Sequence, residues 1–177
     1  MATRYFSLDE AQALVPQVRT LLGQALQLHG HLRLAIARLS EAGHEITWAM
    51  LRGEDQLRRG DELVDDEFDD GPPPGKPHDK RAEQSLERAR MIYRTLREMV
   101  GQIEALGVEV KGVVEGLVDF RSWCDGEQEV VLCWKLGEPE IRFFHTVDDG
   151  FSGRKPISGH AFTAKPEQRS DFASKSS

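Results

Sequence analysis

The chain has 177 residues, long enough for one compact domain or for a helical part with a small appendage. Its formal net charge of −7 belongs to one segment, because seven acids and no base fall between Asp61 and Asp70. No apolar run approaches the roughly 18–20 residues that cross a bilayer, and the N-terminus lacks an export signal. Cys124 and Cys133 lack the pairing of a zinc ribbon. We therefore expect a cytoplasmic protein with no membrane segment and no structural disulfide.

The first predicted element is a long helix. Ser7 followed by Glu10 is a capping box and predicts a start at Leu8, and Pro16 is expected to bend the helix without ending it. Apolar residues then recur at steps of four and three, the spacing that keeps one seam against a partner helix. His29 interrupts the seam and is interpreted as a polar residue that fixes register. The seam comprises Ala11, Val15, Val18, Leu22, Ala25, His29, Leu32, Ile36 and Leu39.

A second long helix follows after a gap. Residues 45–59 are compatible with a short third helix, and residues 61–80 are acidic and then rich in Pro and Gly, which predicts a mobile loop. The same spacing of four and three returns from Ala82 to Ile103 and ends at Gly107. Residues 5–106 are therefore predicted to form an antiparallel helical hairpin.

The residue composition changes after Gly107. β-branched and aromatic runs separated by glycines predict a small unit of three antiparallel strands over residues 107–160. Residues 161–177 are small and polar and are predicted to be disordered. The predicted fold class is α+β, a long hairpin followed by this β-unit. A lone hairpin leaves apolar surface uncovered, so a homodimer is expected.

The densest group of candidate functional residues lies near the third predicted strand. Gly150 and Gly153 bracket a loop in which Arg154 offers a cationic donor to an anion. A structural alternative is that Phe151 fills a core while Arg154 pairs with Glu138, Glu140 or Asp148. The candidate binding residues are Trp134, Glu138, His145, Phe151 and Arg154.

A metal site is a further alternative for this region, since imidazole and carboxylate are ordinary ligands of zinc, iron and manganese. The candidate ligands are Glu138, Glu140, His145 and Asp149, and their spacing is not diagnostic. A hydrogen-bonded strand histidine is the structural alternative, and no cofactor is predicted. Cys133 is interpreted as a packed thiol and not as a nucleophile.

Three segments of the sequence resemble a known family. They are "YFSLDEAQALVPQVR", "LGVEVK…GLVDF" and "LCWKLGEPEI…FH…GFSGRKPI", in that order between Tyr5 and Ile157. They resemble an uncharacterised bacterial family known only as a domain of unknown function. The resemblance implies the same division into hairpin and β-unit and no particular activity. Its aromatic pair and single histidine match Phe143, Phe144 and His145, which leaves no second histidine beside the first.

The leading functional hypothesis is a non-enzymatic interaction or scaffold protein that binds a protein partner through the β-unit and its Gly-rich loop. The main alternative is a small metal- or anion-dependent enzyme centred on His145. A third is a nucleic-acid-associated protein that uses arginines of the second long helix. These arginines are Arg88, Arg90, Arg94 and Arg97.

Overall fold

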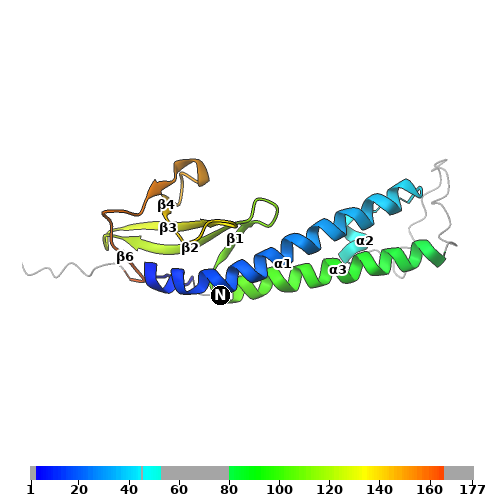
Figure 1. The fold of residues 1–177 in the computed structure, drawn as a ribbon, viewed down its shortest axis with the longest axis horizontal. Helices are drawn as coiled ribbons and strands as arrows, with labels where there is room; N and C mark the ends of the chain where they lie inside the picture. Colours follow the sequence, from blue (N-terminus) through cyan, green and yellow to red (C-terminus); the bar gives the residue numbers. More distant parts are fainter. Residues whose placement is uncertain (1–2, 45, 53–79, 166–177) are drawn as a thin grey trace, which may run out of the picture. The chain divides into compact units, whose positions relative to one another are not determined.

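The computed structural model describes residues 3–44, 46–52 and 80–165 (Figure 1). The order of elements is two long helices with a short helix between them, followed by an antiparallel sheet, which confirms the predicted α+β class. The predicted loop at 61–80, apart from Lys80, and the predicted tail beyond residue 165 lie outside the described residues. The helices are α1 Leu8–Glu41, α2 Trp48–Arg52 and α3 Lys80–Ala105.

Helix α1 begins where the capping box predicts. The backbone N–H of Ser7 donates to Glu10 Oε2 at 2.8 Å, and the N–H of Glu10 donates to Ser7 Oγ at 3.3 Å. These two bonds satisfy amide groups that the first turn of a helix leaves without partners. The helix continues through Pro16 to Glu41.

Glycines end both long helices. Gly43 has φ +84 and its N–H donates to Ser40, while Gly107 has φ +89 and its N–H donates to Glu104. Only glycine adopts these left-handed angles at little cost, which is why helices so often stop at it. Of the predicted short helix at 45–59, residues Trp48–Arg52 are helical as α2, and residues 53–59 are outside the described part.

The chain divides into two compact units, at Gly23–Gln24 in α1 and at Val100–Gly101 in α3. The predicted boundary at residue 107 differs from this, because the start of α1 and the end of α3 cluster with the sheet. In the helical unit α1 and α3 run antiparallel (Figure 1). Its apolar seam is buried, as the spacing predicts, at Ala25, Leu32, Leu39, Ala89 and Leu96.

The sheet has more strands than predicted. Its strands follow the order β1-β2-β3-β4-β5, all antiparallel. Strand β6 pairs with Trp123 and Cys124 of β2, beyond the residues of β2 that pair with β1. The first predicted strand, residues 108–120, is in fact a hairpin of two strands, because Gly116 (φ +68) turns the chain back. The bounds are β1 Glu109–Gly112, β2 Leu117–Cys124, β3 Gln128–Lys135, β4 Phe143–Thr146, β5 Lys155–Pro156 and β6 Phe162–Thr163.

Strand β6 corrects the predicted start of the disordered tail. Phe162 lies opposite Cys124 and is only 6 % exposed. Its ring packs against Phe144, with 5.1 Å between ring centroids. Composition alone missed this contact because a single aromatic residue in a polar segment supplies the anchor, and the prediction of disorder is wrong for residues 161–165.

The two faces of the sheet differ in character. Even-numbered residues of β2, β3 and β4 point to one face and join Phe6 and the part of α1 up to Leu22 in the core. The 3₁₀ turn η2, Phe151–Gly153, lies on the opposite side of the sheet from the first part of α1 (Figure 1). In the described residues no helix is long and apolar enough to cross a membrane. The core residues of the sheet are Val118, Phe120, Cys124, Val130, Leu132, Trp134, Phe144 and Phe162.

Candidate functional site

Three chemically reactive side chains lie on the face of the sheet that turns away from α1. Asp119 in β2 is directly opposite Cys133 in β3, and His145 in β4 is opposite Val131, two residues from Cys133. Because side chains alternate along a strand, these odd-numbered residues share one face. All three are buried, with exposed fractions of 3 %, 1 % and 4 %. We call Asp119, Cys133 and His145 the pocket cluster.

The pocket cluster is tight enough to act as one site. One donor atom from each residue lies within 4.8 Å of the donor atoms of the other two. His145 Nε2 is 3.7 Å from Asp119 Oδ2. The Cys133 thiol is a neighbour of the same carboxyl and affects its pKa.

The imidazole of His145 is held in one orientation. Its Nδ1 lies 2.7 Å from the backbone carbonyl oxygen of Thr146, which can only accept a hydrogen bond, so Nδ1 carries the proton. In the neutral ring the lone pair is therefore on Nε2, the nitrogen that faces Asp119.

Burial favours the neutral form of both acids in the cluster. It raises the pKa of the Asp119 carboxyl, although the nearby His145 opposes the shift. Burial also raises the pKa of the Cys133 thiol to about 12, and the charge of Asp119 adds to the effect while that of Arg154 opposes it. At neutral pH Cys133 is therefore a protonated thiol.

This arrangement does not suit a cysteine nucleophile. Such a nucleophile needs a lowered pKa or an adjacent general base. Here burial and the neighbouring Asp119 move the thiol pKa upward. The prediction that Cys133 is a packed thiol and not a nucleophile agrees with this upward shift.

A pocket of about 280 Å³ opens above the cluster. Its apolar walls come from the sheet and from the segment that leads into η2, and Glu109 with its partners Lys111 and Arg121 supplies a charged border. Strongly polar groups beneath apolar walls are the usual composition of a ligand site. The apolar lining residues are Leu117, Val131, Val147 and Phe151.

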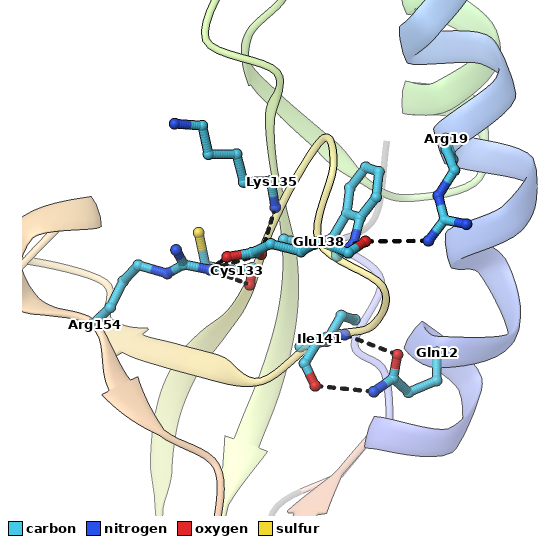
Figure 2. A network of polar contacts seen from close by, with 8 residues as sticks. Gln12, Arg19, Cys133, Lys135, Glu138, Ile141 and Arg154 are labelled. Carbon is cyan, nitrogen blue, oxygen red and sulfur yellow. Dashed lines mark hydrogen bonds and ion pairs between the residues drawn. The ribbon is translucent and has the colours of Figure 1, made fainter.

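The predicted binding residues Glu138 and Arg154 meet as an ion pair. Arg154 Nη2 lies 3.0 Å from each carboxylate oxygen of Glu138 and also donates to the backbone oxygen of Cys133 at 3.2 Å (Figure 2). The Arg154 guanidinium also contacts the rings of Phe143 and Phe151, at 4.4 and 4.7 Å from their centroids. The structural alternative is therefore observed for the pairing of Arg154 with Glu138, but not for Phe151, which is exposed and does not fill a core.

The Glu138 turn is also fixed to α1. Figure 2 shows Arg19 reaching the backbone oxygen of Glu138 while Arg154 holds its side chain. Gln12 exchanges two hydrogen bonds with the backbone of Ile141, each 2.9 Å long. These bonds hold the connection between β3 and β4, and with it the start of the strand that carries His145.

The other predicted binding residues separate. Trp134 is fully buried in the core and its indole N–H donates to the Glu138 carbonyl at 3.1 Å. Phe151 is 42 % exposed at the wall of the pocket. Of the five predicted binding residues, only Phe151 presents a large exposed side chain.

The predicted metal ligands do not come together. In the described residues two groups of three or more candidate ligands lie within 4.8 Å, and neither contains Glu138, Glu140 or Asp149. Glu138 is engaged by Arg154, while Glu140 and Asp149 are exposed in turns. His145 is retained, with Asp119 and Cys133 as neighbours instead.

The second group has the same residue types in a different setting. Cys124, Asp125 and His160 meet where the turn after β2 touches the chain before β6, and we call them the turn cluster. Asp125 Oδ1 accepts the backbone N–H of Ala161 at 2.8 Å, and Oδ2 lies 2.8 Å from His160 Nδ1. The carboxylate thus anchors the C-terminal segment to the turn.

The arginines predicted to contact nucleic acid are not equivalent. Arg90 donates to the backbone oxygen of Met50 at 2.8 Å and pairs with Glu87 at 3.5 Å. Arg88, Arg94 and Arg97 are exposed on α3. Arg90 thus links α3 to α2. The nucleic-acid hypothesis stays a prediction, and so do the homodimer and the protein partner.

Sequence reasoning found His145 but missed Asp119 and Cys133 as its partners. The three residues are 14 and 12 positions apart and meet only through strand register. A signal was present, because Asp119 interrupts the run "LVDF" in a predicted strand, where aspartate is disfavoured.

Comparison with known proteins gives one match. Neither a curated protein nor a solved structure is detectably similar to the chain. A family described as "Uncharacterized conserved protein (DUF2203)" matches residues 4–157, a span that includes the pocket cluster, the Glu138–Arg154 pair and η2. The chain therefore belongs to the DUF2203 family.

Proposed function

We propose that the protein is a small enzyme or ligand-binding protein whose site is the pocket above Asp119, Cys133 and His145. The observation that carries the proposal is the burial of Asp119, 3 % exposed, at the floor of a pocket with apolar walls. A buried carboxyl costs stability that an apolar side chain at the same position would not. Proteins retain such groups where function requires them, and perturbed acids in clefts mark functional sites.

The pocket favours a compact ligand. Its volume of about 280 Å³ lies just below the roughly 300–1,000 Å³ of sites for drug-sized molecules. The apolar walls suit a ligand with a short aliphatic or aromatic body, and the cluster beneath suits a polar head group such as a carbonyl. This supports the hypothesis of an enzyme centred on His145, with a different set of partners for that histidine.

Burial is also the reason to prefer the pocket over a protein-binding surface. A docking surface must reach its partner, yet Trp134 and His145 are almost fully buried and Glu138 is paired with Arg154. Phe151 and Val147 are exposed beside the pocket and are the residues that still favour a protein partner.

The test blocks the pocket without disturbing the core. Val147 lines the pocket and is 47 % exposed, so Val147→Trp should fold and fill the opening. Val114→Trp is the matched control, because Val114 is 56 % exposed and does not line the pocket. The probes are small amides, esters and aldehydes, and saturation-transfer NMR measures their binding.

We expect probes that bind the wild type to be lost with Val147→Trp and kept with Val114→Trp. Equal binding to both variants, or binding of no probe at all, would count against a small-molecule site. If Val147→Trp instead abolished capture of a protein partner while no probe bound, the interaction hypothesis would replace the pocket.

A further inference from the structure

We propose that the pocket cluster binds a divalent transition-metal ion, Zn²⁺ by its ligand chemistry, through Asp119 Oδ2, Cys133 Sγ and His145 Nε2. The inference rests on the proposed function in that it places the metal at the floor of the same pocket. It differs from the metal site expected from the sequence in two of its three ligands.

The three donor atoms match what zinc accepts. Zn²⁺ binds cysteine thiolate, histidine nitrogen and carboxylate oxygen in tetrahedral geometry, with bonds of about 2.0–2.3 Å. Two ligands at about 2.0 Å on a tetrahedral centre lie about 3.3 Å apart. Nε2 and Oδ2 are 3.7 Å apart, so a small side-chain movement brings them to that spacing.

The second contact of His145 is the one that metal-binding histidines make. Such a histidine nearly always donates its other ring N–H to a carboxylate, a backbone carbonyl or water, which fixes the ring and the tautomer. Nδ1 of His145 does this with the Thr146 carbonyl at 2.7 Å. Nε2 is left directed at the cluster.

Charge balance also favours a dication. Binding of Zn²⁺ would displace the proton of the Cys133 thiol to solvent. The resulting thiolate, a carboxylate and a neutral imidazole carry −2 together, which Zn²⁺ neutralises in a site where isolated charge is costly. A sulfur ligand disfavours the binding of Mg²⁺ and Ca²⁺, because both ions prefer oxygen ligands. A mixture of sulfur, nitrogen and oxygen ligands suits Zn²⁺.

The number of ligands indicates a site that can do chemistry. In the described part of the chain the group holds three candidate ligands, whereas structural zinc sites use four. The fourth position would face the pocket, which Val147 and Phe151 help to line. A zinc ion with an open position polarises a carbonyl or activates a water molecule, and this is the chemistry a small carbonyl substrate would need.

The turn cluster is an internal comparison for the assignment. It offers the same three residue types at a similar spacing, but both oxygens of Asp125 already serve Ala161 and His160. Cys124 and Cys133 are both buried free thiols. Cys124→Ser is therefore a matched control for Cys133→Ser.

The experiment uses the full chain without an affinity tag. Zn²⁺ content is measured after dialysis, and Zn²⁺ affinity is measured in competition with a chromophoric chelator. Co²⁺ is added in place of Zn²⁺, because a thiolate ligand gives a charge-transfer absorption band that nitrogen and oxygen ligands do not. Circular dichroism confirms that each variant is folded.

We expect one Zn²⁺ per chain and a thiolate-to-cobalt band. Loss of an outer partner of a zinc ligand costs about 10–100-fold in affinity, so loss of a ligand in Cys133→Ser should cost more than about 100-fold. Cys124→Ser should leave both affinity and band unchanged. His145→Gln, whose affinity should also fall, covers the case in which Cys133→Ser does not fold.

Three results would overturn the inference: no stoichiometric Zn²⁺ or Co²⁺, a cobalt complex without the thiolate band, or equal loss in Cys124→Ser. Binding of a carbonyl probe to metal-free protein, blocked by Val147→Trp, would leave the proposed function standing alone. If Zn²⁺ bound but no probe bound in a way that Val147→Trp blocks, the metal site would stand and the proposed small-molecule function would not.

Discussion

The pocket cluster and the turn cluster contain the same three residue types, yet their surroundings give them opposite properties. In the turn cluster a backbone N–H and His160 lower the pKa of Asp125, so its carboxylate is a structural clamp. In the pocket cluster burial raises the pKa of Asp119, and the carboxyl faces a cavity. The residue types alone therefore do not identify a reactive site. The partners of the carboxylate identify it.

The largest expected effect is the stabilisation of the fold by zinc. An ion that binds only the folded state, at 100 times its Kd, adds about 2.7 kcal/mol to the free energy of unfolding. We expect this gain in the wild type and in Cys124→Ser, and its absence in Cys133→Ser. Urea unfolding with and without Zn²⁺ measures it, and an equal gain in all three proteins would show that the two clusters do not differ.

A smaller effect is expected from Asp119→Asn in metal-free protein. The variant removes a buried charge and keeps the shape of the side chain, so its free energy of unfolding at neutral pH should be about 1 kcal/mol higher than that of the wild type. Its matched control, Asp125→Asn, should lose stability, since the clamp depends on the charged form.

The sign of the pH dependence follows from the raised pKa of Asp119. Below its ordinary pKa of 3.8 the carboxyl is neutral in both the folded and unfolded states, and Asp119→Asn should give no advantage. As pH rises through the higher folded pKa, the wild type loses stability and the advantage appears. An advantage that stayed constant from pH 3 to pH 8 would contradict this account.

The smallest expected effect is local and of opposite sign. The pKa of Asp125 is lowered first by the backbone N–H of Ala161 and then by His160, so its contribution is complete above the ordinary pKa of 3.8. It should be lost as pH falls through the folded value. Hydrogen exchange at the Ala161 amide, corrected for intrinsic rate, should show less protection in acid, whereas unchanged protection would mean that the carboxylate does not anchor this segment.

Local chemistry made the helical part of the protein predictable. Ser7 and Glu10 cap α1 through bonds within four residues, and Gly43 and Gly107 end helices because of their own backbone freedom. The seam spacing predicts which residues are buried because a helix repeats regularly along the chain. Each of these signals lies within a few residues of the feature that it predicts.

The candidate site was predictable only in part, because register brought it together. His145 and Phe151 could be selected from their neighbourhood in the sequence, but Asp119 and Cys133 are joined to His145 by the pairing of three strands. Glu138 and Trp134 looked like site residues for the same local reason, and pairing and burial assign them to the scaffold. Shifting any strand by one residue would place its side chain on the opposite face.

The sequence by itself determined where α1 begins and where α3 ends, which face of each long helix is apolar, and that a sheet follows them, since propensity, capping and periodicity act over short distances along the chain. The tertiary structure alone decided that Asp119, Cys133 and His145 share a pocket and that Asp125 does not. The energy of bringing such groups together depends on strand pairing and burial, which link residues far apart in the chain.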